Sequence, residues 1–352
     1  MASRELGPGG RYDAPIPESS QRSDHDHPNL TVLPAFCHEA LIYDGLESFE
    51  RGAVPFVLEG LTAGEAVLVL LPNEKVEVLT DKLGRIDSPR PPLEPLDAAD
   101  LRTVGHNPSR ILPALMDFVA NQPPGRPCRA IAEPMFGGRG EDELDECMQH
   151  ERLVNIAFGT GQPWRLLCLF DTTAVPTELL DDARREHPLL HQGDSVVYNR
   201  LFRPEDGKRI LALPPLSPRP PQAERLSFTT GYLRAVRRFV LRHAGAAGLE
   251  ATKSNDLVLA VNELAANSVR FGGNRGTLWL WTADRELICE VEDDGQLLQP
   301  LAGREKPESS AETGRGLWMV NQLCDLVQLR SSPAGTTVRV HMNMHGPDDQ
   351  TA

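Results

Sequence analysis

Apolar and polar residues are distributed differently in the two halves of the chain. In the first half, continuous apolar runs such as AVLVLL at 66–71 and WRLLCLFD at 164–171 alternate with amphipathic stretches. Apolar runs of this length are typical of strands buried on both faces of a parallel sheet, and the amphipathic stretches predict connecting helices. We therefore expect an α/β domain with a mainly parallel sheet over residues 36–202.

The elements expected in this domain alternate along the chain. We predict strands at 40–43, 66–71, 128–133 and 164–171, helices at 46–60, 76–83, 109–121, 141–159 and 181–187, and a proline-rich loop before the helix at 109–121. Parallel sheets bind ligands at the carboxyl ends of their strands, which points to Pro72-Asn73-Glu74, Glu133 and Asp171. The segment PNEKVEVL after the strand at 66–71 is not a G-x-x-x-x-G-K-[ST] phosphate loop, and this favours a sensory role over catalysis.

In the second half, apolar residues recur with helical spacing over 254–273, SNDLVLAVNELAANSVRFGG, and Ser254, Asn255 and Asp256 are candidate N-caps. Glu263 and Asn267 lie one turn apart on the same face of this helix, and Arg270 continues the row. A carboxylate and an amide in this arrangement can hold a hydrated magnesium ion and a hydroxyl group. The alternative is that these three residues form only the solvated stripe of an amphipathic helix.

The elements that follow this helix form a recognisable order. We predict strands at 277–282 and 286–292, a turn at Asp293-Asp294-Gly295, a loop at 301–313, a helix from Gly314-Arg315-Gly316-Leu317 to Cys324, and strands at 326–331 and 336–342. A glycine-flanked helix start offers free backbone N–H groups to phosphates. Each piece alone is a weak signal, but their order and spacing together favour a nucleotide site.

Residues 225–344 resemble the ATP-binding domain of the GHKL superfamily, and within it the anti-sigma-factor serine kinases. The segments NELAANSVRFG, VEDDG and GRGLWMV match the three boxes of that family. The resemblance implies an α+β Bergerat fold, with helices on one face of a mixed sheet, that binds ATP and Mg²⁺. In one place the sequence departs from the family pattern, because Leu297 occupies the position of the second glycine in the second box. This departure raises the question of whether ATP binding is weakened.

The resemblance also implies a role for individual residues. Glu263 matches the general base that accepts the substrate hydroxyl proton, and Asn267 matches the magnesium ligand. Asp293 matches the carboxylate that receives the adenine amino group, and Thr336 or Thr337 matches the threonine near adenine. The full implied nucleotide site consists of Asn267, Arg270, Asp293, Gly295, Gly314, Arg315, Gly316, Leu317, Thr336 and Thr337.

The first domain is similar to the MEDS sensory domain, a regulatory module related to the RecA-like core. The similarity rests on HEALIYDGLESFERGAVPFVLEGLTAGEAVLVLLP, EPMF, HERLVNIAF, WRLLCLFD and the His-Pro pair at 187–188. It implies signal input, with sensory candidates His38, Tyr43, Glu133, Glu151, Asn155, Asp171 and His187. Structural alternatives remain: His187 can be a helix stop, and Glu151 with Asn155 can belong to a structural hydrogen-bond network.

The segments outside the two domains are polar or rich in proline. We expect a disordered tail at 1–30, a second tail at 345–352 and a semi-rigid proline-rich linker at 203–224. His25 and His27 in the first tail could bind a metal, although a solvated tail is favoured. A helix is predicted at 229–243, with Phe228, Tyr232, Val236, Phe239 and Val240 on its apolar face. On its basic face, Arg234, Arg237 and Arg238 are either solvated or, by the resemblance, in contact with a partner.

Composition limits the classes of function that remain. The net charge of -14 argues against a general nucleic-acid binder, and the 352 residues suggest about two domains. The six cysteines form no C-x-x-C pair, and no apolar run is long enough for a membrane span. Because the N-terminus also lacks a hydrophobic signal core, we expect a cytoplasmic protein that binds neither membranes nor nucleic acid directly.

Together, the two resemblances imply a sensory domain that controls an anti-sigma-factor kinase. Such a protein would phosphorylate a serine or threonine of a STAS-type antagonist and sequester a sigma factor, with a homodimer through the strand face as a further candidate assembly. The alternative is a module that switches partners without phosphotransfer. An ordinary histidine kinase is disfavoured, because no helical hairpin with an acceptor histidine precedes the ATP-binding region.

Overall fold

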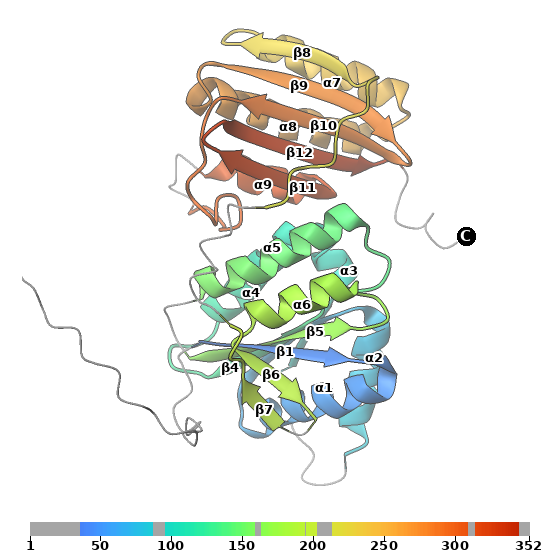
Figure 1. The fold of residues 1–352 in the computed structure, drawn as a ribbon, viewed down its shortest axis with the longest axis vertical. Helices are drawn as coiled ribbons and strands as arrows, with labels where there is room; N and C mark the ends of the chain where they lie inside the picture. Colours follow the sequence, from blue (N-terminus) through green and yellow to red (C-terminus); the bar gives the residue numbers. More distant parts are fainter. Residues whose placement is uncertain are drawn as a thin grey trace, which may run out of the picture. The chain divides into compact units, whose positions relative to one another are not determined.

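A seven-stranded sheet organises the first half of the chain in the computed structural model, which describes residues 36–86, 96–158, 163–193, 195–202, 213–308 and 314–344 (Figure 1). The strand order is β3-β2-β4-β5-β1-β6-β7, and every pairing is parallel except β6 with β7. The strands are β1 (Phe36–Tyr43), β2 (Ala66–Leu71), β3 (Leu96–Asp100), β4 (Cys128–Ala132), β5 (Trp164–Asp171), β6 (Leu189–Gln192) and β7 (Ser195–Tyr198). The expected α/β domain with a mainly parallel sheet is confirmed.

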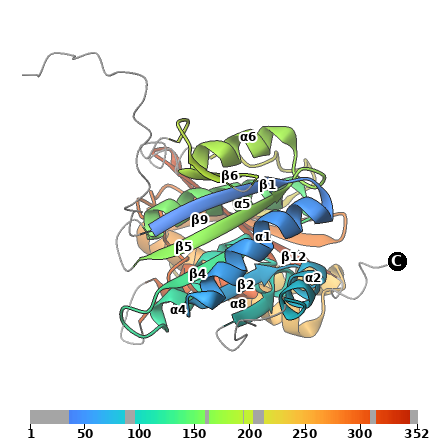
Figure 2. The same cartoon turned by 90° about the horizontal axis from the view of Figure 1, so that it is seen from below.

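Helices cover both faces of this sheet, and each face has its own apolar core (Figure 2). The helical elements are α1 (Gly45–Thr62), α2 (Asn73–Gly84), α3 (Leu101–Val104), η1 (Pro108–Arg110), α4 (Ile111–Ala120), α5 (Glu141–Ala157) and α6 (Thr177–Glu186). Leu41 and Tyr43 of β1 pack with residues of α1 and α2, whereas Ala40 packs with residues of α4, α5 and α6. Because side chains alternate along a strand, His38 and Tyr43 point to opposite faces of the sheet.

Three strands of the first sheet were not predicted. β3 lies in the segment that was expected to be a proline-rich loop, and its sequence LDAAD has no apolar run. β6 and β7 form a short antiparallel hairpin of four residues each. Strands of this length carry too few residues to show a periodicity. Pairing determines their conformation: β3 pairs with β2, β6 pairs with β1, and β7 pairs with β6.

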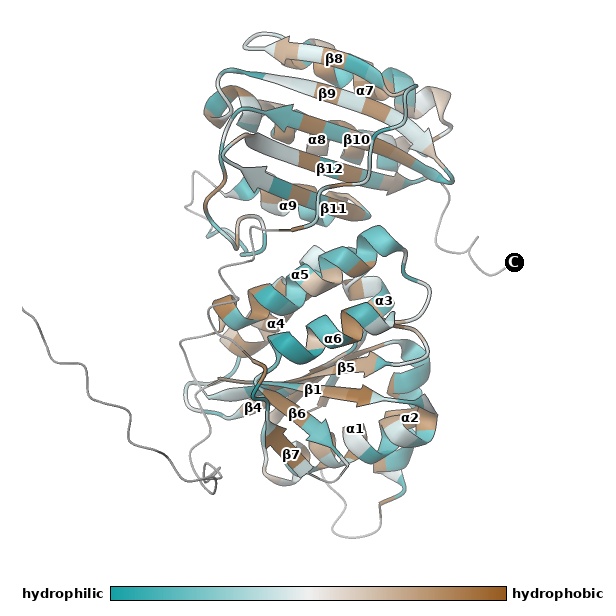
Figure 3. Cartoon of the chain, in the orientation of Figure 1, coloured by the Kyte–Doolittle hydropathy of each residue, from teal (hydrophilic) through white to brown (hydrophobic). Residues whose placement is uncertain are grey.

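The second half of the chain forms a five-stranded sheet in the order β11-β12-β10-β9-β8, with α7, α8 and α9 on one face. Its strands are β8 (Glu224–Thr229), β9 (Arg275–Ala283), β10 (Glu286–Asp293), β11 (Leu326–Ser332) and β12 (Gly335–Asn343), and its helices are α7 (Leu233–Ala246), α8 (Ala251–Phe271) and α9 (Arg315–Leu323). Figure 3 shows apolar and polar residues alternating along these strands, as a sheet with helices on one face requires. The sheet is antiparallel at every described pairing, so the expectation of a mixed sheet was wrong.

Two helix boundaries differ from the prediction for identifiable reasons. α7 begins at Leu233 rather than 229, because Thr229 belongs to β8 and Gly231 has a φ of +87°, which interrupts a helix. Tyr232 is therefore exposed instead of lying on the apolar face. α8 begins at Ala251, and Ser254 is a buried residue of its first turns whose hydroxyl donates to the Leu249 carbonyl at 3.1 Å, not an N-cap.

The described part of the linker, 213–223, runs across the open face of the second sheet and is bound to it. Arg330 of β11 donates to the Pro214 carbonyl at 2.7 Å, and Arg339 of β12 donates to the Ser217 hydroxyl at 2.9 Å. Arg219 pairs with Glu292 of β10 at 2.7 Å. This segment therefore covers part of the strand face that was a candidate for dimerisation, and it is more than a spacer.

Several predictions fall on residues outside the described ranges. These are the tails at 1–30 and 345–352, with His25 and His27, and the linker portion at 203–212. Within the described ranges, none of the helices combines the length and the apolar character needed to cross a membrane.

Candidate functional site

The end of α8 and the start of α9 meet at Glu263, Asn267 and Gly316. Both polar side chains are half-buried and come from the same face of α8. A Cβ atom at Gly316 would lie 3.3 Å from Glu263 Oε2 and 3.3 Å from Asn267 Nδ2. Only glycine at this position keeps the backbone of α9 next to a carboxylate and an amide without filling the space between them.

The N-terminus of α9 is shaped by Gly314. This residue is the N-cap, with a φ of 88° in the left-handed region, and no side chain caps the helix. The first N–H groups of a helix have no partner within the helix and carry partial positive charge. The arrangement therefore offers uncapped backbone donors beside Glu263 and Asn267, as a phosphate group requires.

Asp293 ends β10 with its side chain on the helical face of the sheet. Its two carboxylate oxygens accept separate hydrogen bonds, from Ser268 Oγ to Oδ2 at 2.6 Å and from Gly295 N to Oδ1 at 2.8 Å. Two glycines allow this packing, because a Cβ at Gly272 would lie 2.3 Å from Asp293 Cγ and a Cβ at Gly295 would lie 2.7 Å from the Phe271 carbonyl oxygen. The carboxylate is thus fixed in orientation and keeps further lone pairs for a ligand.

The two candidate threonines face opposite sides of the sheet. Thr336 pairs in register with Asp293, and its hydroxyl donates to the Gly295 carbonyl at 2.9 Å. Thr337 pairs with Glu292 and points to the open face of the sheet. Of the two alternatives, Thr336 is the one that lies beside Asp293.

The remaining residues of the implied nucleotide site are peripheral to this centre. Arg270 is exposed, and its guanidinium lies 5.0 Å from the centroid of the Phe271 ring. Arg315 is also exposed and reaches the Glu308 carbonyl at 3.5 Å. Leu317 packs against the core between α8 and the sheet.

Leu297 stands where the related family has a second glycine. Its backbone N–H donates to Ser331 Oγ at 2.8 Å, and the same hydroxyl bonds Thr336 Oγ1 at 2.8 Å. Asn274 and Asp284 are the non-glycine residues with positive φ in the described ranges, so Leu297 does not require the conformational freedom of glycine. The substitution is therefore accommodated without backbone strain.

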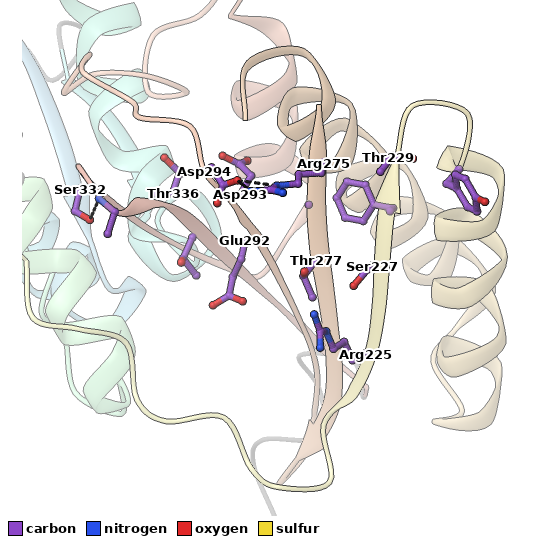
Figure 4. A pocket seen from close by; sticks show the side chains of 16 residues that line it. Arg225, Ser227, Thr229, Arg275, Thr277, Glu292, Asp293, Asp294, Ser332 and Thr336 are labelled. Carbon is purple, nitrogen blue, oxygen red and sulfur yellow. Dashed lines mark hydrogen bonds and ion pairs between the residues drawn. The ribbon is translucent and has the colours of Figure 1, made fainter. Parts of the chain in front are cut away.

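A groove of about 820 Å³ lies on the open face of the second sheet (Figure 4). Arg225, Ser227, Thr277 and Glu292 line it from β8, β9 and β10. Figure 4 shows Arg275 at its rim, where it pairs with Asp294 at 2.7 Å. None of the residues of α8 or α9 lines this groove. Asp293 and Thr336 also line the groove at the strand ends, so it adjoins the motif residues there but does not reach Glu263, Asn267 or Gly316.

The basic face of α7 is exposed at Arg234, Arg237 and Arg238. Arg237 donates to the Asn262 side chain at 2.7 Å and so links this face to α8, one residue before Glu263. A partner that binds these arginines would lie close to the candidate catalytic helix.

In the first domain, the sensory candidates separate into two clusters on opposite faces of the sheet. The first cluster lies at the carboxyl ends of β1, β4 and β5 and contains Tyr43, Glu133 and Asp171. Lys75 joins them, with its Nζ 2.5 Å from Glu133 Oε1 and 3.5 Å from Asp171 Oδ2. Burial raises the pKa of Glu133 even though Lys75 opposes that shift. No sequence signal singles out Lys75, because a lysine near a helix start is usually solvated.

The second cluster contains His38, Glu151, Asn155 and His187. Cys168 of β5 completes it, with its Sγ 3.3 Å from His38 Nε2. Its position in the apolar run WRLLCLFD indicated only a small buried residue. Only the register of β1 with β5 indicates that Cys168 lies near His38. Cys168 pairs with Ala40, and Ala40 is on the same face of the sheet as His38 because side chains alternate along a strand.

Comparisons with known proteins agree with this division of the chain. Residues 37–188 match the model of the MEDS family, the methanogen/methylotroph, DcmR sensory domain, and residues 226–342 match the histidine kinase-like ATPase domain. No curated protein matches the chain.

Two solved structures share weaker likeness. The RsbU and RsbW domains of a Mycobacterium tuberculosis protein are 20% identical with a TM-score of 0.27, over 37% of this chain and 34% of that one, so the chain covers about a third of that structure. The Acinetobacter baumannii histidine kinase AdeS is 16% identical with a TM-score of 0.22, over 57% of this chain and 96% of that one. Neither likeness supports a statement about function at these TM-scores. The two family matches coincide with the two sheets, so the chain consists of a region similar to the MEDS domain followed by a region similar to the histidine kinase-like ATPase domain.

Proposed function

We propose that the second domain binds ATP with Mg²⁺ and phosphorylates a serine or threonine of an anti-sigma-factor antagonist, a STAS-type protein. In this proposal the same domain sequesters a sigma factor, and the first domain controls the exchange between the two partners. The observation that carries the proposal is the placement of Glu263 and Asn267 against the backbone of Gly316. A base, a metal ligand and phosphate-binding N–H groups are the three components that phosphoryl transfer to a hydroxyl needs.

The nucleotide base would be held by Asp293. Hydrogen bonds from Ser268 and Gly295 orient this carboxylate, and its remaining lone pairs can accept from an exocyclic amino group. A carboxylate that accepts only from an amino group favours adenine over a base with a carbonyl oxygen at the same position. Thr336, bonded to the Gly295 carbonyl, would form the adjoining wall.

The phosphoryl-transfer end would be formed by Asn267 and Glu263. Asn267 would hold Mg²⁺ through Oδ1, and the ion would neutralise charge on the phosphates. The partner's hydroxyl oxygen bonds to the γ-phosphorus as the bond to the ADP oxygen breaks, and Glu263 accepts the hydroxyl proton. Positioning of the hydroxyl by Glu263 is expected to matter most, because phosphoryl transfer depends mainly on alignment and charge neutralisation.

We infer that a route from the first domain to the proposed nucleotide site runs through Glu146 of α5. This buried carboxylate pairs with Arg330 of β11 at 2.7 Å and with Arg304, between β10 and α9, at 3.3 Å. Burial raises the pKa of Glu146, and the two arginines oppose that shift. We expect Glu146→Gln to change the ATP affinity of the full chain. The control, Glu141→Gln at the exposed start of α5, should bind ATP as wild type does. If Glu146→Gln and wild type bind ATP with equal affinity, this route does not exist.

The proposal is tested with the full chain by measuring ATP binding and phosphate transfer separately. Glu263→Gln is expected to keep magnesium-ATP binding within about twofold and to lose phosphotransfer to the antagonist by at least about a hundredfold, the usual contribution of a general base. Asn267→Ala is expected to lose the magnesium-dependent part of ATP binding. Asn255→Ala, which changes an exposed polar residue near the start of α8, is the control and should retain both properties. Unchanged transfer by Glu263→Gln would contradict the proposal.

A second candidate function is a partner-switching module that binds nucleotide without transferring phosphate. Leu297, in place of the family's glycine, is the feature that favours it, because a half-buried side chain replaces open space beside the nucleotide loop. Tight antagonist binding by the wild-type chain without detectable phosphate transfer at saturating magnesium-ATP would support this second function.

A further inference from the structure

Four side chains with metal-ligating atoms converge in the first domain, on the face of the sheet covered by α5 and α6. They are His38, Glu151, Cys168 and His187, and each is at most 1% exposed. One ligand atom from each lies within 4.8 Å of the other three. His38 Nε2 is 3.2 Å from Glu151 Oε2 and 3.3 Å from Cys168 Sγ, and His187 Nε2 is 3.4 Å from Glu151 Oε2.

Hydrogen bonds outside the cluster direct both imidazoles towards its centre. His38 Nδ1 bonds Asn155 Oδ1 at 3.0 Å, and His187 Nδ1 bonds the Ala183 carbonyl at 2.7 Å. The Asn155 amide is itself oriented, because its Nδ2 donates to the Glu186 carbonyl at 2.9 Å. Both Nδ1 atoms therefore act as donors, and both Nε2 atoms present lone pairs to the cluster. Metal-bound histidines are held in this way by a second layer of acceptors.

The cluster holds more acceptors than donors. Among the described residues, His187 Nε2 and Glu151 Oε1 are buried atoms without a hydrogen-bond partner. A purely hydrogen-bonded core would need a buried imidazolium to bridge these atoms, since the Nδ1 protons already point outward. Buried polar atoms that lack partners are costly, and a cation at the centre would satisfy all four groups at once.

We propose that His38, Glu151, Cys168 and His187 bind one divalent metal ion of the zinc class in a four-coordinate site. A tetrahedral ion with bonds of about 2.0–2.3 Å separates its ligand atoms by about 3.3–3.7 Å. Three separations in the cluster, of 3.2, 3.3 and 3.4 Å, are close to this range, and all four ligand atoms lie within 4.8 Å of one another. Two imidazoles, a thiolate and a carboxylate suit Zn²⁺, whereas Mg²⁺ and Ca²⁺ prefer oxygen ligands alone. The site is separate from the proposed nucleotide site, and its existence does not depend on that proposal.

The position of the ligands in the fold indicates what the ion does. His38 and Cys168 come from the central strands β1 and β5, Glu151 comes from α5, and His187 directly follows α6. The ion would thus join two helices to the centre of the sheet. Four protein ligands leave no open position for a substrate, so the site stabilises or switches the domain and does not perform catalysis. Glu151 lies on the same helix as Glu146, so occupancy of the site would also constrain the helix that contacts Arg304 and Arg330.

The test measures metal binding by the full chain without an affinity tag. Protein stripped with a chelator is titrated with Zn²⁺ against a chromophoric competitor and, separately, with Co²⁺ under reducing conditions. Wild type is expected to bind one equivalent and to show, with Co²⁺, the sulfur-to-metal charge-transfer band and the intense visible absorption of a tetrahedral thiolate site. Histidines elsewhere in the chain cannot produce the thiolate band.

Three variants and a matched control locate the site. Cys168→Ser and His187→Gln are expected to lose stoichiometric binding and the cobalt spectrum, whereas Cys128→Ser, which changes another buried strand cysteine of the same core, keeps both. Asn155→Ala leaves all four ligands in place and is expected to weaken Zn²⁺ binding by roughly 10–100-fold. Circular dichroism and gel filtration establish whether each variant is folded. If Cys168→Ser or His187→Gln does not fold, Zn²⁺ binding by Asn155→Ala decides the test. Failure of folded wild type to bind Zn²⁺ or Co²⁺, or binding that Cys168→Ser and Asn155→Ala leave unchanged, would overturn the proposal.

Discussion

Ser268 of α8 donates a hydrogen bond of 2.6 Å to Asp293 at the end of β10, joining two segments that lie 25 positions apart in the sequence. This bond fixes the carboxylate on the helical face of the sheet. The next residue, Asp294, is exposed instead and pairs with Arg275 at 2.7 Å. The two adjacent aspartates therefore have different structural roles, and this difference can be measured.

Asp293→Asn is expected to weaken ATP binding by the full chain about 10- to 150-fold, the value of a hydrogen bond to a charged group. The substitution replaces one acceptor oxygen of the carboxylate by an NH₂ donor. That NH₂ group would then face another donor, which is the Ser268 hydroxyl, the Gly295 N–H or the adenine amino group. Asp294→Asn is the matched control and should bind ATP as wild type does. Isothermal titration calorimetry with magnesium-ATP measures both, and equal losses in the two variants would argue against Asp293 as the residue that reads the base.

Most elements of the second domain could be predicted from its sequence, because its motifs are identified both by their residue types and by the order in which they follow one another. Glu263 and Asn267 were placed on one helix face by their spacing, and Gly314 and Gly316 at the start of the next helix. Sequence could not determine that the backbone of Gly316 approaches both side chains, because that contact depends on how α8 and α9 pack. It also left Thr336 and Thr337 as alternatives, which strand register separates.

In the first domain, the buried strands were predictable and the polar clusters were only partly so. Continuous apolar runs identified β2 and β5, whereas β3, with its sequence LDAAD, carries no such signal. The seven sensory candidates divide between two faces of the sheet because of the alternation along β1, which separates His38 from Tyr43. Lys75 and Cys168 were missed, since the side chains they meet come from distant segments.

Gly316→Ala and Gly245→Ala make a second pair with opposite expected outcomes. Both glycines lie in helices, but a Cβ at Gly245 meets nothing within 4 Å, whereas one at Gly316 would meet Glu263 and Asn267 at 3.3 Å. Gly245→Ala is expected to stabilise the protein by about 0.5–1 kcal/mol with unchanged ATP binding. Gly316→Ala is expected to keep its stability and to lose ATP affinity by roughly tenfold or more, because the methyl group fills space beside the candidate phosphate donors. Urea unfolding and calorimetry test the pair; normal ATP affinity in Gly316→Ala would place the phosphates elsewhere.

The buried ion pair between Glu290 and Arg339 is expected to matter for stability. The two residues are 2% and 3% exposed, and Arg339 Nη2 lies 2.6 Å from Glu290 Oε2. Arg339→Met should destabilise the second domain by about 3 kcal/mol, the low end of the range for breaking a buried pair, because Glu290 keeps Arg219 as a partner. Glu290→Leu combined with Arg339→Met should recover much of the loss. Denaturant unfolding of the single and double variants gives the coupling free energy.

The control for this prediction is the exposed pair of Arg275 and Asp294. Arg275→Ala should cost no more than about 1 kcal/mol, since solvent screens exposed pairs. A loss of similar size for Arg275→Ala and Arg339→Met would mean that burial does not distinguish the two pairs.

Asp171 should make the stability of the first domain depend on acid pH. Burial alone would raise the pKa of this carboxyl, but hydrogen bonds from the Thr173 hydroxyl and backbone N–H, together with the charge of Lys75, outweigh that effect and lower it. A folded pKa below the unfolded value of about 3.9 means that the unfolded state binds the proton more readily. The stabilisation by Asp171 is therefore present above about pH 4 and is lost as the pH falls through the lower, folded pKa.

Urea unfolding of wild type and Asp171→Asn, followed by circular dichroism between about pH 6 and pH 3, isolates this contribution. Other carboxylates titrate in both proteins, so only the difference in unfolding free energy between them reports on Asp171. That difference should be constant near pH 6 and should shrink on the acid side of about pH 4. Protonation of Asp171 in wild type removes the negative charge that the Asp171→Asn substitution also removes. A constant difference between wild type and Asp171→Asn across the whole range would mean that Thr173 and Lys75 do not stabilise the carboxylate over the carboxylic acid.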